Sequence, residues 1–303
     1  MAKVKLGINN CFAAKRWPEP EEWSRIIVEE FGLEVVQFSF DLADPLLSKS
    51  VRPRISQDIA KVASNFGITI CSTFTGLSFY SFNQLLHPNP RIRERALRFC
   101  EEAILMTGEM NVKATGGPLG SLSFKDFHDP SRKEYLTDCL IESIQYLSEI
   151  ASSLGQKFLL WEPTPISREL TETREKARKF YERVNKRAKV PVLFCLDVGH
   201  QCLRSGLKED KDPYVWVKEF AHISPVIHIQ QTDGVYDRHW PFTDEYNRKG
   251  IIKPEKLIET IENSKAEEVI LILEIIHPFE EDENKVLSDL KESVDFWKRK
   301  LAG

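Results

Sequence analysis

Eight short apolar or β-branched segments recur along this 303-residue chain, and each is followed by a charged segment with helical spacing. Apolar character that runs through a segment without strict alternation is typical of a parallel strand covered on both faces. The expected strands are residues 4–9, 33–39, 68–73, 111–116, 157–162, 192–197, 226–230 and 268–274. The expected helices are residues 20–31, 54–66, 90–107, 132–154, 169–188, 213–222, 254–263 and 281–300.

Eight strands that alternate with eight helices in 303 residues predict an α/β fold of one kind, the closed (β/α)₈ or TIM barrel. An open doubly wound sheet is the competing fold, but it normally carries a glycine-rich phosphate turn after its first strand. The segment after residue 8, Asn9-Asn10-Cys11-Phe12, offers no such turn. No linker or composition break divides the chain, so residues 1–303 are expected to form a single catalytic domain. Glycines are expected to cap four helices, at Gly32, Gly67, Gly108 and Gly155.

The composition is that of an ordinary globular protein, with 42% hydrophobic and 29% charged residues and a formal net charge of −4. Lys and Arg are spread along the chain, which argues against nucleic acid as a partner. The six cysteines include no CxxC pair and are expected to be reduced thiols. The N-terminus lacks a secretory signal, and no apolar run approaches the about 20 residues that span a membrane, so we expect a cytoplasmic protein.

Ionisable residues stand at the ends of four consecutive expected strands: Glu162, Asp197, His228 (within its strand) and Glu274. The active site of such a barrel lies at the C-terminal ends of the strands. A charged group that closes an apolar strand is costly to desolvate unless it is paired or bound to a metal. Each residue alone could belong to a structural salt bridge, but the four together predict a shared site.

Three carboxylates and one imidazole are a hard, mostly oxygen-donor set. It suits one Mn²⁺, Mg²⁺ or Co²⁺ ion with positions open for substrate oxygens, and Mn²⁺ is our first expectation. The set fits a structural zinc poorly, while zinc in a catalytic role stays open.

Two further residues are candidates for binding the substrate. His200, three residues past Asp197, could direct its ring at a ligand on the metal, and the alternative is an exposed loop histidine. Arg238 could stabilise a developing oxyanion or bind a phosphate, and the alternative is a surface arginine. The neighbouring His239 and Trp240 carry weaker indications.

These residues, in this order on the last four strands, resemble the xylose isomerase-like TIM barrels, and most closely the D-tagatose 3-epimerase (ketose 3-epimerase) group. Residues 7–9, 161–165 and 228–234 resemble the D-erythrulose 1-phosphate 3-epimerase branch. The resemblance implies that the four strand-end residues are the metal ligands, that Glu162 and Glu274 are also the proton-transfer pair, and that His200 and Arg238 bind substrate oxygens. The family's arginine usually lies closer behind the strand-seven histidine than Arg238 does.

The reaction expected from this set is proton transfer beside a ketone, through a metal-stabilised enediolate. Return of the proton to the opposite face of the same carbon gives epimerisation, and its return to the adjacent carbon gives aldose–ketose isomerisation. The same ligands support both, so a metal-dependent carbohydrate epimerase/isomerase, with a ketose 3-epimerase first, is the expectation. The substrate is a small sugar or a sugar phosphate. A homo-oligomer is expected only by analogy with similar enzymes.

Other functions remain open on the same fold. They are a hydroxypyruvate-type isomerase, an inosose-type dehydratase, an endonuclease IV-like nuclease and a non-catalytic sugar-binding barrel. The nuclease would need more histidines for several zinc ions and a basic mouth for phosphates, and the negative net charge disfavours it.

Overall fold

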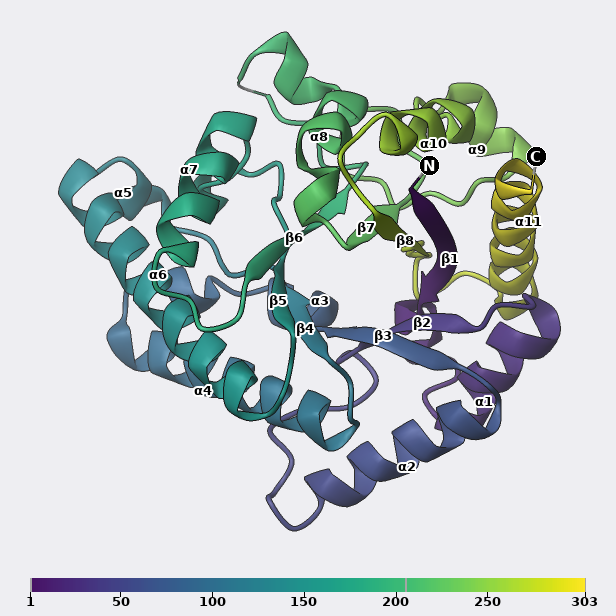
Figure 1. Ribbon diagram of the computed structural model, residues 1–303, viewed down its shortest axis with the longest axis horizontal. Coiled ribbons are helices and arrows are strands. Elements are labelled where there is room, and N and C mark those ends of the chain that lie inside the picture. Colours follow the sequence, from purple (N-terminus) through teal and green to yellow (C-terminus); the bar gives the residue numbers. More distant parts are fainter. Residues whose placement is uncertain (1, 205, 303) are drawn as a thin grey trace. The chain divides into compact units, whose positions relative to one another are not determined.

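The computed structural model describes residues 2–204 and 206–302, and its strands form a closed parallel barrel in the order β1-β2-β3-β4-β5-β6-β7-β8 (Figure 1). The predicted TIM barrel is therefore confirmed. Each strand lies within two or three residues of its predicted bounds, because a continuous apolar run is a local signal. The strands are β1 (Lys3–Asn9), β2 (Val35–Ser39), β3 (Thr69–Phe74), β4 (Ala114–Gly117), β5 (Phe158–Trp161), β6 (Val192–Asp197), β7 (Val226–Ile229) and β8 (Glu268–Leu273).

Helices follow the strands along the chain. Eight of them match the predicted segments: α1 (Pro20–Arg25), α2 (Arg52–Asn65), α4 (Pro90–Glu109), α6 (Pro130–Ser153), α7 (Arg174–Asn185), α8 (Pro213–Phe220), α10 (Pro254–Glu262) and α11 (Glu283–Leu301). The predicted segment 20–31 continues beyond α1 as a π-helical turn, Ile26–Glu30. Short helices within the loops were not predicted, because a single turn has no periodicity to read; they are α3 (Gly76–Tyr80), α5 (Phe124–Phe127) and α9 (Asp244–Lys249).

Three of the four expected glycine caps have the left-handed backbone that favours glycine, with φ of +57° at Gly32, +75° at Gly67 and +70° at Gly155. Gly108 was wrongly assigned, because α4 runs through it to Glu109. The left-handed residue after α4 is Asn111, with φ of +59°. Asparagine tolerates this conformation better than most residues with a side chain, so it substitutes for glycine at the helix end.

The described chain divides into two compact units. The first consists of Met1–Phe38, Lys61–Ile70 and Phe194–Gly303, and the second of Ser39–Ala60 and Cys71–Leu193. The expectation of one catalytic domain over residues 1–303 stays a prediction. No helix among the described residues has the length and apolar character needed to cross a bilayer.

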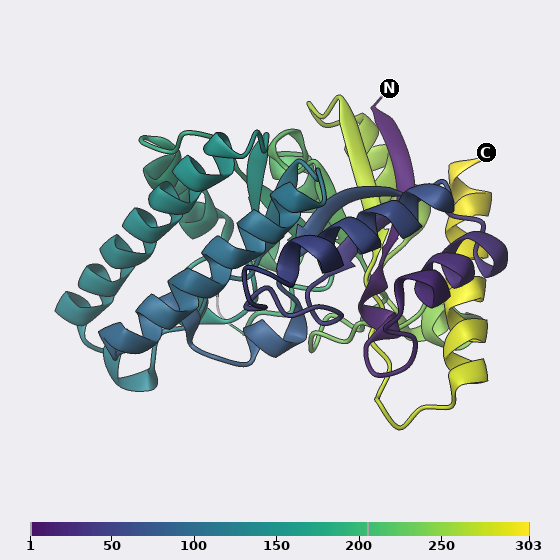
Figure 2. The same ribbon diagram turned by 90° about the horizontal axis from the view of Figure 1, so that it is seen from below.

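The first unit is built on the parallel strands β1, β8 and β7. β1 pairs with β8 from Lys3 opposite Glu268 to Ile8 opposite Leu273. Helix α11 lies beside β1 in both views (Figures 1 and 2). Its buried side chains recur with helical spacing and are fully covered: Val286, Leu290, Val294 and Trp297. Asp282 caps the helix by accepting hydrogen bonds from two backbone N–H groups of the first turn.

In the second unit, α4 and α6 pack against each other (Figure 2) and neighbour β4 and β5. Both helices begin with proline at the first position, after the side-chain caps Asn89 and Asp129. Arg52 of α2 is buried and donates to the Glu109 carboxylate at 2.8 and 3.1 Å. Such a pairing offsets the cost of burying the guanidinium.

We predict that Leu271→Ala in β8 lowers the free energy of unfolding by about 2–5 kcal/mol, because the removed atoms leave a cavity among fully buried neighbours. Leu271 has no exposed surface and lies opposite Leu6 and Ile227. The measurement is urea unfolding, with the dependence of the free energy of unfolding on urea concentration the same in both proteins. Ile251→Ala is the matched control, since Ile251 is 38% exposed; a loss of equal size in both variants would contradict the assignment of the core.

Candidate metal centre

Two of the predicted site residues are neighbours in the sheet. Asp197, the last residue of β6, lies opposite His228 of β7. Glu274 follows β8 directly, and its backbone N–H donates to the carbonyl oxygen of Ile229 of β7 at 3.1 Å. The three side chains are buried and each offers one ligand atom, with these atoms within 4.8 Å of one another. The parallel register thus brings an Asp, a His and a Glu together in a buried cluster.

The orientation of the two amide side chains beside this cluster is defined by the backbone. The Cys11 N–H donates to Asn9 Oδ1 at 2.9 Å, so the other end of the Asn9 amide is its Nδ2 donor. This Nδ2 donates to Gln37 Oε1 at 2.9 Å and to Glu274 Oε1 at 3.1 Å. Asn9 and Gln37 are opposite each other on β1 and β2. Gln37 therefore presents an acceptor oxygen to the barrel interior.

That acceptor determines the form of His228. Gln37 Oε1 lies 2.7 Å from His228 Nε2, so Nε2 carries the hydrogen and the neutral ring has its lone pair at Nδ1. Nδ1 is 3.0 Å from Glu274 Oε2 and 4.0 Å from Asp197 Oδ2. In this neutral form Nδ1 and the two carboxylates direct their lone pairs at one another in a buried space, where a divalent cation or a proton on Nδ1 offsets their repulsion. A second-sphere acceptor on the far ring nitrogen is typical of a histidine that ligates metal, so the residues fit a hard divalent ion.

The electrostatics keep Glu274 ionised. Burial by itself raises the pKa of this carboxyl group, but the charge and the hydrogen bond of a His228 protonated on both nitrogens, followed by the charges of His239 and His200, outweigh burial, and the pKa is lowered. A carboxylate rather than a carboxylic acid is therefore present at neutral pH, as both metal binding and proton abstraction require.

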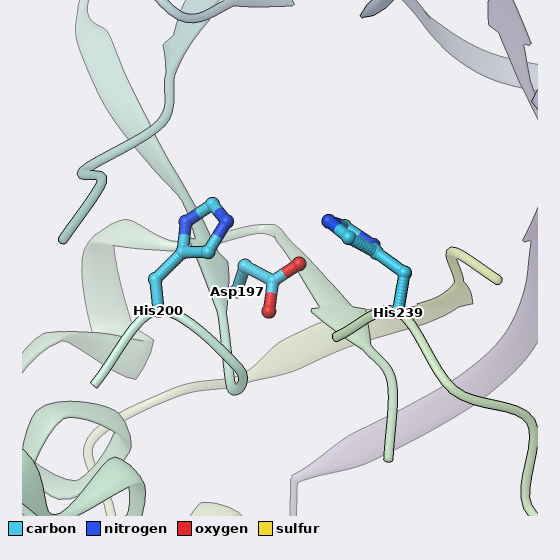
Figure 3. Close-up of side chains that lie close together, drawn as sticks. All are labelled: Asp197, His200 and His239. Atoms are coloured by element: carbon cyan, nitrogen blue, oxygen red, sulfur yellow. The ribbon is translucent and has the colours of Figure 1, made fainter. Parts of the chain in front are cut away.

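A second group of side chains lies on the other side of Asp197 (Figure 3). His200, in the loop after β6, and His239, in the loop after β7, turn their rings toward each other with the Asp197 carboxylate between and below them. One ligand atom of each of the three lies within 4.8 Å of the others. Asp237 joins them, since its Oδ2 is 3.3 Å from His200 Nε2 and 3.2 Å from His239 Nε2. This arrangement can hold a cation or bind the oxygens of a polar ligand.

Gln230 connects the two groups. Its Nε2 donates to both oxygens of Asp197 at 3.1 Å and to Asp237 at 2.8 Å, and its Oε1 accepts from the His239 backbone N–H. Gly199 leaves the space that this amide needs, because a Cβ at Gly199 would overlap the Gln230 carboxamide. The Gly199 N–H also donates to Asp197 at 2.5 Å. The carboxylate of Asp197 is thus held in place by two donor groups, the Gln230 amide and the Gly199 backbone N–H.

The charges in this second group stabilise one another. Burial alone would lower the pKa of His239, but Asp237, with Glu274 and Asp197 beyond it, raises that pKa to about 10. Burial raises the pKa of Asp237, and the charges of His200 and His239 more than offset this, so the pKa lies well below its usual value. Asp237 is therefore an anion between two imidazoles.

Arg238 has a different environment from its two neighbours. Its guanidinium donates to Asp233 Oδ2 at 2.7 and 3.1 Å, and it stacks over the rings of Tyr236 and Trp240. This hydrogen bond lowers the pKa of Asp233. The structure thus brings His239, not Arg238, to Asp197, and contact of Arg238 with a substrate stays a prediction.

Glu162 belongs to the second unit. It follows β5 directly, as predicted, and its side chain is buried at 6% exposure. Its role as the fourth ligand stays a prediction.

Several residues of this centre were not predicted from the sequence as site residues: Asn9, Gln37, Gln230 and Asp237, with His239 only weakly indicated. The neutral amides give no charge signal in an apolar strand. One usable signal exists for Asp237 and His239, since a histidine and an aspartate two apart in a loop after a barrel strand can share one site. The loop has no strand periodicity, however, so the sequence does not show which way its side chains point. The backbone of His239 has a left-handed φ of +48°, which no local pattern predicts.

Comparison with known proteins agrees with this architecture. A sequence model of the xylose isomerase-like TIM barrel family matches residues 27–300. The chain is 27% identical over 296 residues to the D-erythrulose 1-phosphate 3-epimerase of Brucella abortus (strain 2308), covering 97% of this chain and 95% of that protein. A crystal structure from Rhodospirillum rubrum ATCC 11170, of a protein provisionally named xylose isomerase, has 33% identity and a TM-score of 0.91, over 98% of this chain and 99% of that one.

A more distant solved structure has the same fold. It is the D-psicose 3-epimerase of Clostridium cellulolyticum H10 with D-tagatose, which has 15% identity and a TM-score of 0.71 over 98% of this chain and 99% of that one.

We predict that Gln230→Leu lowers the free energy of unfolding by about 1–3 kcal/mol, because it leaves the buried oxygens of Asp197 and the oxygen of Asp237 without their amide donor. Gln57→Leu, at an exposed position of α2, should change it by no more than about 0.5 kcal/mol. Urea unfolding of both variants checks this. Equal stability of Gln230→Leu and the wild type would mean that this network does not depend on Gln230.

Proposed function

The chain belongs to the xylose isomerase-like TIM barrel family, and we propose that within it the protein is a metal-dependent ketose 3-epimerase that acts on a small ketose or ketose phosphate. One observation carries the proposal: the lone pair of His228 and the carboxylates of Asp197 and Glu274 face one buried point. The names of two relatives, a D-erythrulose 1-phosphate 3-epimerase and a D-psicose 3-epimerase, support the choice of reaction.

The cation would be held by Asp197, His228 and Glu274 together with Glu162, and we expect Mn²⁺ first among divalent ions. When bound, it would supply Lewis-acid polarisation of the substrate oxygens. The residues around it have the remaining tasks. Gln37 and Asn9 keep His228 and Glu274 in one orientation, and a pre-oriented group loses no time or free energy in reorganising during reaction.

Glu274 and Glu162 are the proposed proton-transfer pair. Glu274 is an ionised carboxylate in a buried position, so it can accept the proton from carbon 3 when that carbon is within hydrogen-bond reach. Glu162 would return a proton to the opposite face, and the configuration at carbon 3 inverts. The C–H bond that breaks on one face is replaced by a C–H bond on the other, so the sugar is neither oxidised nor reduced.

His200 is the proposed donor to substrate oxygens, and His239 is a positioning residue in place of the Arg238 expected from the family. His239 Nδ1 lies 3.1 Å from the Glu274 carbonyl and its Nε2 lies 3.2 Å from Asp237 Oδ2, so His239 links Glu274 to the Asp237 that also contacts His200. A donor of this kind would orient the carbonyl and the adjacent hydroxyl group relative to Glu274. Arg238, paired with Asp233, would then act on the substrate only if that ion pair opened.

We predict that the wild-type protein, incubated with ketoses and ketose phosphates in D₂O with Mn²⁺, places deuterium at carbon 3 with inverted configuration. Glu274→Gln should reduce this inversion by about 10²- to 10⁴-fold, the usual contribution of a general base. Proton and carbon NMR of the product give both the position and the configuration.

The matched control is Glu262→Gln, at an exposed carboxylate at the end of α10, which should retain wild-type rates. Normal exchange in Glu274→Gln would reject the proton-transfer assignment. Hydrogen transfer between carbons 1 and 2, with no deuterium at carbon 3, would instead establish an aldose–ketose isomerase.

We also predict that cation removal by a chelator lowers the thermal unfolding temperature and that added Mn²⁺ restores it. A ligand at 100 times its dissociation constant stabilises the folded state by about 2.7 kcal/mol. His228→Gln should abolish most of this Mn²⁺ effect, whereas His222→Gln, outside the cluster, should retain it. Scanning calorimetry measures the shift, and a full Mn²⁺ effect in His228→Gln would place the cation elsewhere.

A further inference from the structure

The chain after β1 and the chain after β8 are joined by two sets of contacts. In the first set, Asn9 at the end of β1 donates to Glu274, which follows β8, inside the candidate centre. Further out, Arg16 Nη2 donates to the Pro278 carbonyl at 2.6 Å, and Lys15 Nζ lies 4.3 Å from the centre of the Phe279 ring. Two consecutive cations of the loop after β1 therefore contact the loop after β8, which begins at Glu274.

Arg16 is not neutralised by an acidic partner. No carboxylate among the described residues forms an ion pair with it, and its hydrogen-bond partner is the neutral carbonyl of Pro278. The guanidinium is a permanent cation with five N–H hydrogens, so it keeps donors and an uncompensated charge for an acceptor that is an anion.

His277, which precedes Pro278, is a titratable neighbour of Arg16, and it does not supply that charge. Its side chain is 6% exposed, with Nε2 3.3 Å from Asp289 Oδ2 and with Nδ1 buried and unpartnered. Asp289 is itself bonded to Lys285 at 2.5 and 2.6 Å. Burial, together with the charges of Arg16 and Lys285, lowers the pKa of His277, so the ring is neutral. The Asp289 carboxylate is thus paired with Lys285 and does not neutralise Arg16. Arg16 keeps its full positive charge.

We propose that Arg16, assisted by Lys15, forms an anion subsite on the rim that binds the phosphomonoester of a ketose phosphate while carbon 3 lies at Glu274. A guanidinium offers paired N–H groups in a fork that matches two phosphate oxygens. The carbonyl of Pro278 accepts one Nη2 hydrogen, which leaves the remaining Nη hydrogens for the ester. Lys15 adds a second positive charge, and its left-handed φ of +64° is a costly conformation for a residue with a side chain.

The position fits the length of such a substrate. Pro278 is four residues after Glu274, so its backbone lies within about 14 Å of that residue even along a fully extended chain. The Arg16 guanidinium lies at the Pro278 carbonyl, and a ketose phosphate together with the Glu274 side chain can span an interval of this size. The anion subsite and the reacting carbon are then the two ends of one bound molecule.

The inference rests on the proposed function for its substrate, and its test separates the two. We expect Arg16→Gln to lower kcat/KM for a ketose 1-phosphate by about 10- to 100-fold, mainly through a higher KM, the range for one hydrogen bond to a charged group. The matching unphosphorylated ketose should keep its kcat/KM within about twofold. Arg16→Lys should recover part of the loss, and Arg25→Gln, an exposed cation of α1, should change neither value.

A binding measurement completes the test without any turnover. Inorganic phosphate, titrated by ³¹P NMR, should bind the wild-type protein and Arg25→Gln, and should bind Arg16→Gln more weakly by a similar factor. Equal losses of kcat/KM for the phosphorylated and free ketose in Arg16→Gln would overturn the inference and assign Arg16 to loop structure alone. Unchanged phosphate binding in that variant would also overturn it. Absence of carbon 3 inversion in the wild type, with phosphate binding still dependent on Arg16, would reject only the proposed epimerase.

Discussion

The candidate centre depends on one constraint, the donated hydrogen between His228 Nε2 and Gln37 Oε1. Because this bond is made, Nδ1 faces Glu274 and Asp197, at 3.0 and 4.0 Å from their carboxylate oxygens, and the ring nitrogen and the two carboxylates meet at one buried point. Burying such a set without a counter-charge would be costly. The chemistry of the centre therefore follows from an amide that carries no charge and touches no metal.

The same constraint extends outward through hydrogen bonds between neighbouring strands. The Cys11 N–H orients Asn9, Asn9 orients both Gln37 and Glu274, and Gln37 orients His228. On the other side, Gln230 orients Asp197 and Asp237, between which His200 and His239 are held. Each member of these networks is bonded to another, which gives a rigid site and leaves few alternative side-chain positions. Rigidity of this kind is what the transfer of a proton between defined faces of a small sugar needs.

Much of the barrel could be predicted from the sequence because its signals are local. The run from residue 192 to residue 197 predicted β6 at its observed bounds, since a strand buried on both faces has no polar interruption. Asp197 and Glu274 were identifiable for the same reason, as ionisable residues at the boundary of an apolar segment. Gly108 was misread, because a glycine near the end of a periodic segment looks the same whether it lies inside the helix or caps it.

By itself, the sequence determined the alternation of strands and helices and the residues that stand at the strand ends. Those features depend on the order of apolar and polar side chains over a few residues. Only the tertiary structure decided that His239 reaches Asp197 while Arg238 turns to Asp233, and that Gln37 of β2 meets His228 of β7. These pairings join residues between 5 and 191 positions apart, and no local pattern encodes a contact made by the closing of a sheet and the φ angle of one loop residue.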